Sequence, residues 1–127
     1  MEDDLFVGKR ILIVGDDPQS FEHLKTILET THASLIHTEN EIGAMQICMD
    51  INPDVILLDC HIPGVEDYNT VRQIVTLLPN KCVIVLTDTS TSADKDILLN
   101  LGCRDSLVKP VAGNILLETI KKYFHKY

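Results

Sequence analysis

The stretch Val55-Ile-Leu-Leu-Asp59 decides the fold of this chain. Four apolar residues run without a break and end on a carboxylate, between Pro53-Asp54 and Pro63-Gly64. Such a run predicts a strand that is buried on both faces, as in the middle of a parallel sheet. In open α/β sheets, ligands bind just outside the carboxyl ends of the strands. Asp59 is therefore the first position to examine for function.

Four further segments are apolar in the same way and are expected to be strands. They lie at Arg10–Val14, Ala33–His37, Cys82–Leu86 and Ser106–Val108. Apolar residues at helical spacing predict helices after Pro18, at Glu41–Asp50, at about Val71–Leu78, at about Ala93–Leu101 and at the end of the chain. Strict alternation of apolar strands and helices predicts a parallel sheet covered by helices on both faces.

Residues that start and stop helices lie between these segments. Asp17 is a suitable N-cap and Pro18 a suitable first helical residue. Gly102 is typical of the position that follows a helix. In the segment Glu41–Asp50, apolar residues at helical spacing indicate a helix. They are Ile42, Met45, Cys48 and Met49.

The composition limits what the chain can be. Its 127 residues, 45% hydrophobic and 24% charged, suit a single globular domain over residues 1–127. The formal net charge of -8 argues against a nucleic-acid surface, which needs a basic patch. No run approaches the roughly 18 apolar residues of a membrane span. We therefore expect no direct binding to nucleic acid or to a membrane.

The cysteines and histidines show no metal-binding pattern. The four cysteines are Cys48, Cys60, Cys82 and Cys103, and none of them forms a Cys-x-x-Cys pair. Reduced, mostly buried thiols are expected in a cytoplasmic protein, and the acidic start Met-Glu-Asp-Asp is unlike a signal peptide. The five histidines lack metal-ligand spacing, so no histidine side chain is expected to bind a metal.

Polar side chains follow four of the expected strands. Asp16 comes after the first strand, Asp59 ends the third, Thr87 follows the fourth and Lys109 follows the fifth. In a doubly wound sheet these ends converge on one edge. Crowded carboxylates repel each other, so a hard divalent cation such as Mg²⁺ is their natural counter-ion. Each residue alone is ordinary at a strand end, but the four together favour a functional site.

Four motifs in order resemble those of the receiver domain of two-component response regulators. They are Ile11-Leu-Ile-Val-Gly-Asp-Asp-Pro18, Val55-Ile-Leu-Leu-Asp59 with Pro63-Gly64, Val83-Ile-Val-Leu-Thr87, and Lys109-Pro110. The resemblance covers essentially the whole chain. It implies a single α/β domain of the flavodoxin-like, doubly wound type, with a five-stranded parallel sheet of order 2-1-3-4-5 and five helices. It also implies a cis peptide bond between Lys109 and Pro110.

The same resemblance makes Asp59 the phosphoacceptor. A histidine kinase, a phosphotransfer protein or a small acyl phosphate would donate the phosphoryl group. Mg²⁺ is the implied cofactor, held by Asp16, Asp59 and the backbone carbonyl of His61, with Asp17 as a further candidate ligand. A metal and fixed donors are also what the charge of a transferring phosphoryl group requires. The implied role is that of a signalling module and not of an enzyme.

The resemblance also indicates how the signal would be passed on. Thr87 would donate a hydrogen bond to a phosphoryl oxygen, and Lys109 would pair with it electrostatically. Asp88, Thr89 and His61 lie at positions that modulate the reaction. A downstream protein, an output domain or a second copy of the chain would bind the face made by the fourth helix, the fifth strand and the fifth helix.

Several positions depart from the family's pattern. Gly15 stands where the first of two acids is usual, which should weaken Mg²⁺ binding. Ser106 stands where an aromatic switch residue is usual, and Asp67 where glycine is usual. Asp88 replaces a small residue beside the phosphoryl position. Its carboxylate would repel a phosphoryl group if it points inward, and would have little effect if it points to solvent.

Three hypotheses about function follow from these observations. The first is a phosphorylation switch at Asp59 with altered tuning. The second is a degenerate receiver that binds proteins without phosphorylation. The third is a flavodoxin-like enzyme with Asp59 as nucleophile, which we rank last because the chain lacks a glycine-rich loop that could cradle phosphate.

Overall fold

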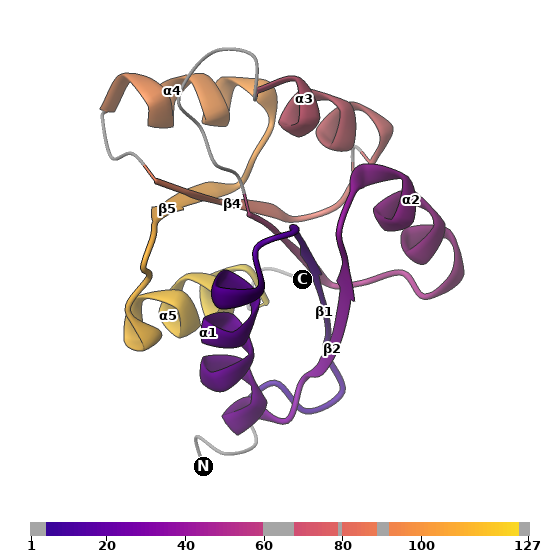
Figure 1. Cartoon of the computed structure of the whole chain (residues 1–127), viewed down its shortest axis with the longest axis vertical. Helices are drawn as coiled ribbons and strands as arrows, with labels where there is room; N and C mark the ends of the chain where they lie inside the picture. Colours follow the sequence, from indigo (N-terminus) through magenta and orange to yellow (C-terminus); the bar gives the residue numbers. More distant parts are fainter. Residues whose placement is uncertain (1–4, 60–67, 79, 89–91, 125–127) are drawn as a thin grey trace.

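The computed structural model describes residues 5–59, 68–78, 80–88 and 92–124. These residues form a five-stranded parallel sheet in the order β2-β1-β3-β4-β5 (Figure 1). The strands are β1 (Arg10–Val14), β2 (Ser34–Thr38), β3 (Val55–Asp59), β4 (Val83–Thr87) and β5 (Asp105–Val108). The α/β class, the doubly wound fold and the strand order predicted from the sequence are confirmed.

Helices cover both faces of this sheet. They are α1 (Pro18–Leu28), α2 (Glu41–Asp50), α3 (Tyr68–Leu77), α4 (Ser92–Leu101) and α5 (Gly113–Phe124), with a short 3-10 helix η2 (Glu29–Thr31) after α1. In Figure 1, α1 and α5 lie on one side of the sheet, and α2, α3 and α4 lie on the other. Among the described residues, no helix has the length and apolar character to cross a membrane.

The apolar strands fill a core with two halves. Side chains alternate along each strand, so neighbouring residues face opposite sides. Leu12, Ile56 and Val85 pack toward α2, α3 and α4, whereas Ile13, Leu57 and Ile84 pack toward α1 and α5. Burial on both faces explains why β1, β3 and β4 are continuous apolar runs in the sequence.

The helix boundary signals act as expected. Asp17 is the N-cap of α1, where its carboxylate accepts a hydrogen bond from the Gln19 N–H at 3.0 Å, and Pro18 begins the helix. Gly102 follows α4 with a φ of +115°, a conformation that glycine adopts without strain. The peptide bond between Lys109 and Pro110 is cis, as the resemblance implied.

The helix α2 has the predicted bounds, but its apolar residues do not all face the core. Ala44 and Cys48 are buried, but Ile42 is 69% exposed and Met49 is 80% exposed. The reason is the small residue Gly43: a Cβ added there would overlap the Thr38 hydroxyl at the end of β2. Ala44 and Cys48 therefore pack in the core, with Ile47 partly buried against it, whereas Ile42 and Met49 turn outward.

The cysteines that the structure describes are free thiols. Cys48, Cys82 and Cys103 are buried and form no disulfide. Burial raises the pKa of Cys82 to about 11 and that of Cys103 to about 12. A thiol with such a pKa is poorly reactive at neutral pH. Cys60 lies outside the described residues.

Candidate functional site

The carboxyl ends of the central strands lie at one edge of the sheet. Val14 of β1 is opposite Leu58 of β3, which brings Gly15 level with Asp59. Thr87 ends β4 and is 1% exposed. Its carbonyl accepts a hydrogen bond from the Lys109 N–H at 2.7 Å, which holds the start of the segment after β5 against β4. The sheet therefore brings together residues predicted from four separate motifs.

Asp59 and Lys109 form an ion pair at this edge. Lys109 Nζ lies 2.5 Å from Asp59 Oδ1, and the two side chains are 11% and 4% exposed. Burial favours the neutral form of Lys109, but Asp59 and Asp88 outweigh it and raise its pKa above the ordinary value. Lys109 is therefore a cation at neutral pH, fixed on one oxygen of the Asp59 carboxylate.

Asp88 approaches the same ammonium group. Its Oδ1 lies 3.4 Å from Lys109 Nζ, and its side chain is half exposed. The Asp88 carboxylate thus turns toward the site and not simply into solvent. One cation stands between two carboxylates, one of which is buried and the other open to water.

The side chain of Asp59 packs over Gly15. A Cβ added to Gly15 would lie 2.8 Å from Asp59 Cβ and 3.3 Å from Asp59 Oδ2. The Gly15 carbonyl accepts a hydrogen bond from His37 Nε2 at 2.8 Å, and the His37 ring stacks on Phe21 with centroids 4.2 Å apart. Glycine therefore gives Asp59 the space it occupies, and β2 and α1 fix the Gly15 backbone.

The remaining predicted ligands differ in their surroundings. Asp16 is exposed after β1, next along the chain from Gly15. Asp17 is engaged as the α1 N-cap, so its carboxylate already has a structural role. His61 and Thr89 lie outside the described residues, as does Asp67.

The carboxylates of this edge are compatible with Mg²⁺. Among the residues described, no group of three or more His, Cys, Asp or Glu side chains is arranged to hold a metal. Asp16 and Asp59 offer two carboxylates at neighbouring strand ends. Mg²⁺ uses one or two protein carboxylates and keeps several waters. The donor set therefore fits Mg²⁺ better than a cation that needs an all-protein cage.

A cavity of about 250 Å³ adjoins the ion pairs on the α1 side. Its lining includes Asp88 and Lys109, together with Gln19, Ser20 and His23 from α1. His23 Nε2 donates a hydrogen bond to the Val111 carbonyl at 2.8 Å, which ties α1 to the segment that follows Pro110. The cavity therefore brings polar groups of α1 to the same space as the Lys109 side chain.

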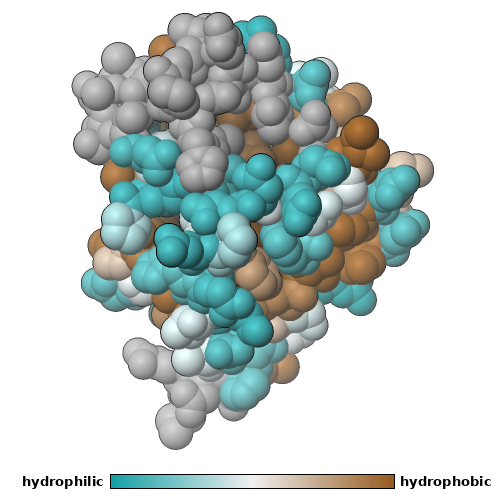
Figure 2. Space-filling model, in the orientation of Figure 1, coloured by the Kyte–Doolittle hydropathy of each residue, from teal (hydrophilic) through white to brown (hydrophobic). Residues whose placement is uncertain are grey.

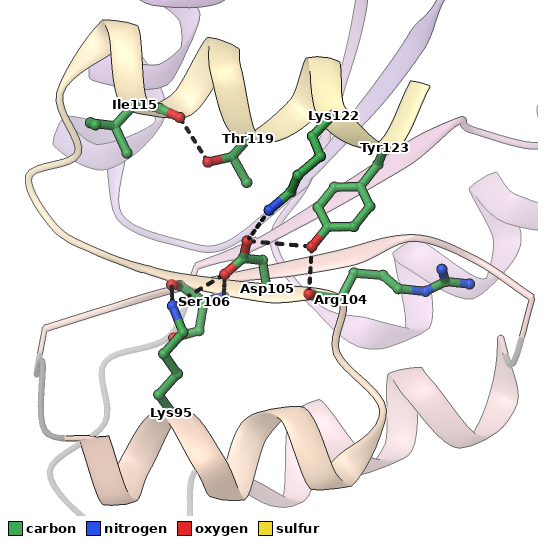
Figure 3. Close-up of polar contacts among 8 residues, drawn as sticks. All are labelled: Lys95, Arg104, Asp105, Ser106, Ile115, Thr119, Lys122 and Tyr123. Carbon is green, nitrogen blue, oxygen red and sulfur yellow. Dashed lines mark hydrogen bonds and ion pairs between the residues drawn. The ribbon is translucent and has the colours of Figure 1, made fainter. Parts of the chain in front are cut away.

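Ser106 belongs to a second polar cluster on β5, which Figure 3 shows. Ser106 is 9% exposed, and its N–H donates to Asp105 Oδ1 at 2.8 Å. Lys95 of α4 and Lys122 of α5 reach the Asp105 carboxylate at 3.3 Å and 3.4 Å. The Tyr123 hydroxyl donates to the Arg104 carbonyl at 2.7 Å and also lies 3.3 Å from Asp105 Oδ2. One carboxylate of β5 thus connects both flanking helices.

The charge state of Asp105 follows from these partners. Burial opposes its ionisation, but the Ser106 N–H, Lys95 and Lys122 outweigh burial and lower its pKa. Burial and the nearby Asp105 raise the pKa of Tyr123 to about 12. Sequence reasoning missed Asp105, because its partners come from α4 and α5 at no fixed spacing.

The chain is similar in sequence to response regulators. A sequence model described as the response regulator receiver domain matches residues 11–121. The protein PilH of Pseudomonas aeruginosa is 33% identical over 113 residues, which cover 87% of this chain and 93% of PilH. The polar-differentiation response regulator DivK of Brucella anthropi is 26% identical over 117 residues, which cover 91% of this chain and 95% of DivK.

Solved structures agree with these relatives. The receiver domain of a signal transduction histidine kinase from Syntrophus aciditrophicus has a TM-score of 0.77 and 31% identity, and the match covers 94% of this chain and 92% of that one. A CheY-like receiver domain from Methanospirillum hungatei has a TM-score of 0.77 and 26% identity, over 93% of this chain and 94% of that one.

Receiver domains are signalling modules of two-component systems and are generally not enzymes. They generally bind Mg²⁺ at an acidic phosphorylation site. They interact with histidine kinases or phosphotransfer proteins and with output partners. The sequence model covers most of the chain, PilH is 33% identical over nearly its whole length, and the strand order agrees with the fold of this family. The chain therefore belongs to the response regulator receiver domain family.

Proposed function

We propose that residues 1–127 form one receiver domain that works as a phosphorylation switch with Asp59 as phosphoacceptor. The observation that carries this proposal is the ion pair between Asp59 Oδ1 and Lys109 Nζ at the carboxyl edge of the sheet. A histidine kinase, a phosphotransfer protein or a small acyl phosphate supplies the phosphoryl group.

Lys109 decides which oxygen of Asp59 reacts. Because its ammonium group is bonded to Oδ1, Oδ2 is the oxygen left to attack phosphorus. As the Oδ2–phosphorus bond forms, the bond from phosphorus to the donor's imidazole nitrogen or acyl oxygen breaks, and its electron pair leaves with the donor. Asp59 becomes an acyl phosphate, and no other reactant is consumed. Fixed positive charge at the site stabilises the transferring group.

Mg²⁺ is the proposed cofactor of this step. Asp16, Asp59 and the backbone carbonyl of His61 would hold it, while Asp17 contributes less because its carboxylate caps α1. When bound, Mg²⁺ neutralises charge on the phosphoryl oxygens. Gly15 supplies no carboxylate, so we expect weaker binding than at a site with two adjacent acids.

The signal would pass from Thr87 and Lys109 to the face made by α4, β5 and α5. The Thr87 hydroxyl donates to a phosphoryl oxygen, and Lys109 pairs with the new charge. Ser106 has no ring to move, so Asp105 is the stronger connection between α4 and α5 on this face. A downstream protein, an output domain or a second copy of the chain binds there.

Asp88, Thr89 and His61 are the proposed modulators of the reaction. Asp88 competes with the phosphoryl group for Lys109, because both are anions that pair with one ammonium. Gly15 and Asp88 together also favour the second candidate function, a binding module that acts without phosphorylation, since they reduce metal affinity and add repulsion.

Intact mass distinguishes the two candidate functions. The chain is incubated with acetyl phosphate and MgCl₂, and we expect the mass of one added phosphoryl group. Asp59→Asn should add none, whereas Asp54→Asn, at the opposite edge of the sheet, should match the parent. Equal phosphorylation of Asp59→Asn and the parent would reject Asp59 as the acceptor. An unmodified parent would reject the switch in favour of the binding module.

Metal binding is measured separately by titration calorimetry without a phosphoryl donor. Asp16→Asn should weaken Mg²⁺ binding at least several-fold, because it removes one of two carboxylates. An unchanged affinity would remove Asp16 from the ligand set.

A further inference from the structure

Helix α2 carries a stripe of apolar side chains that faces water. Ile42 and Met49 are 69% and 80% exposed, and Met45 between them is partly exposed. Their spacing of three and four residues places them on one side of the helix, over a length of about 10 Å. In Figure 2, hydrophobic residues reach the surface on the side where Figure 1 places α2.

The fold holds this stripe outward. Ala44 and Cys48 of α2 are buried in the core, and a Cβ on Gly43 would overlap Thr38 Oγ1. The Asn40 side chain caps the helix by accepting the Gly43 N–H at 2.9 Å. If α2 rotated about its axis to bury Ile42 and Met49, the hydrogen bond from the Gly43 N–H to Asn40 would break. The close contact between Gly43 and Thr38 of β2 would also be lost. The exposure therefore belongs to the packed state.

The chain segment around the stripe is acidic, and the cation Arg10 lies beyond the C-terminal end of α2, where its guanidinium donates to the Ile51 carbonyl at 2.6 Å. Residues 34–54 contain Glu39, Glu41, Asp50 and Asp54 but no Lys or Arg. Glu39 and Asp50, near the two ends of α2, are exposed. A second copy of the chain would bring the same carboxylates against these, and like charges repel. A partner with positive charge beside its apolar residues would bury apolar surface against the stripe and would also attract the carboxylates of Glu39 and Asp50.

We infer that α2 is a docking surface for an amphipathic helix of a partner protein, with an apolar stripe flanked by Lys or Arg. Ile42, Met45 and Met49 would pack between the side chains of that helix, as ridges pack into grooves. Methionine is unbranched and flexible, so it adapts to partners of different shape. This surface is separate from Asp59 and from the face of α4, β5 and α5, and its use does not require phosphorylation.

Two synthetic peptides of 18 residues provide the probe. Both form a helix with the same stripe of leucines, flanked by lysines in one and by glutamates in the other. Binding to the unphosphorylated chain is followed by fluorescence anisotropy of the labelled peptide. We expect the lysine peptide to bind and the glutamate peptide to bind at least tenfold more weakly.

Variants of the chain locate the binding site. The double variant Ile42→Ser with Met49→Ser should weaken binding of the lysine peptide at least tenfold. Leu77→Ser, which changes a residue of α3 that is 55% exposed, should bind within about twofold of the parent. Asp50→Lys should weaken binding of the lysine peptide and strengthen that of the glutamate peptide. It also places a cation at a helix C-terminus, where it is favourable.

Three results would overturn the inference. One is equal binding of the lysine peptide by the parent and by the double variant, with melting temperatures that show both chains to be folded. Another is equal binding of the two peptides by the parent. The third is dimerisation of the parent in sedimentation that the double variant abolishes, because the occupant would then be a second copy.

Discussion

Asp88 Oδ1 lies 3.4 Å from Lys109 Nζ, the same ammonium group that is paired with Asp59 Oδ1. A phosphoryl group on Asp59 would bring about 1.5 to 2 negative charges to the same place. The ion pair is half exposed on the Asp88 side, so water and salt weaken it. Asp88 should therefore compete only modestly with the phosphoryl group for the Lys109 ammonium group.

We expect Asp88→Ala to speed phosphorylation by acetyl phosphate. A partly exposed pair is worth about 0.5–1 kcal/mol, which corresponds to a rate increase of roughly two- to fivefold. The increase should be larger at low salt, where the charge is less screened. Rates are taken from the change in intact mass with time. Asp96→Ala, on an exposed part of α4, is the control, and equal rates for Asp88→Ala and the parent at low salt would exclude competition.

Loss of the Lys109 cation should destabilise the chain. Lys109→Met leaves the Asp59 carboxylate, which is 4% exposed, without its ion-pair partner, and such a loss costs about 3–5 kcal/mol. The pKa of Lys109 is raised, so the pair contributes fully below about pH 10.5 and is lost as the pH rises through the raised value. Urea unfolding of both chains should show a difference at neutral pH that narrows above about pH 11. A difference independent of pH would mean that packing, and not charge, is responsible.

A side chain at position 15 should disturb Asp59. In Gly15→Ala the new Cβ would lie 2.8 Å from Asp59 Cβ, and overpacking of this kind costs about 1–3 kcal/mol. Gly113→Ala is the matched control, because its Cβ would meet Ile27 at an ordinary 3.7 Å. Chemical denaturation should show a loss for Gly15→Ala alone. If both variants are as stable as the parent, the contact of Asp59 with Gly15 is looser than described.

Asp105 should stabilise the folded chain at neutral pH, and this stabilisation should be lost in acid. Its pKa is lowered, so its contribution is present above its ordinary value near pH 4 and is lost as the pH falls through the lowered value. Asp105→Asn should therefore lower stability at neutral pH by about 1 kcal/mol, since its lysine partners are half exposed. The difference from the parent should shrink below about pH 4. Thermal unfolding at several pH values measures it, and a gap that widens in acid would contradict this account.

Much of the fold could be predicted because a strand that is buried on both faces is a continuous apolar run in the sequence. The run Val55–Asp59 matches β3 residue for residue. β2 and β4 begin one residue later than expected, and β5 begins at Asp105. Strand ends depend on hydrogen bonds to neighbouring strands, and apolar pattern alone does not report them.

The failures of sequence reasoning have physical causes. The spacing of Ile42 and Met49 correctly indicates a helix, but it does not say which side meets the sheet, and the small side chains of Gly43 and Ala44 decide that. That Asp59, Thr87 and Lys109 lie together at one edge of the sheet was predictable, because parallel strands align their carboxyl ends. The direction of the Asp88 side chain was not, because it depends on a lysine 21 positions away.

The three thiols that are buried in the described part of the chain can be used to follow local unfolding of the natural chain by alkylation. Cys48 belongs to α2 and faces the core, while Cys82 and Cys103 lie just before β4 and β5. In the folded chain burial keeps alkylating reagents away and the raised pKa values keep the thiols protonated. Each thiol therefore reacts only when the part of the fold that buries it opens. Mass spectrometry of the labelled peptides would time the detachment of α2 separately from the unfolding of β4 and β5, without any engineered probe.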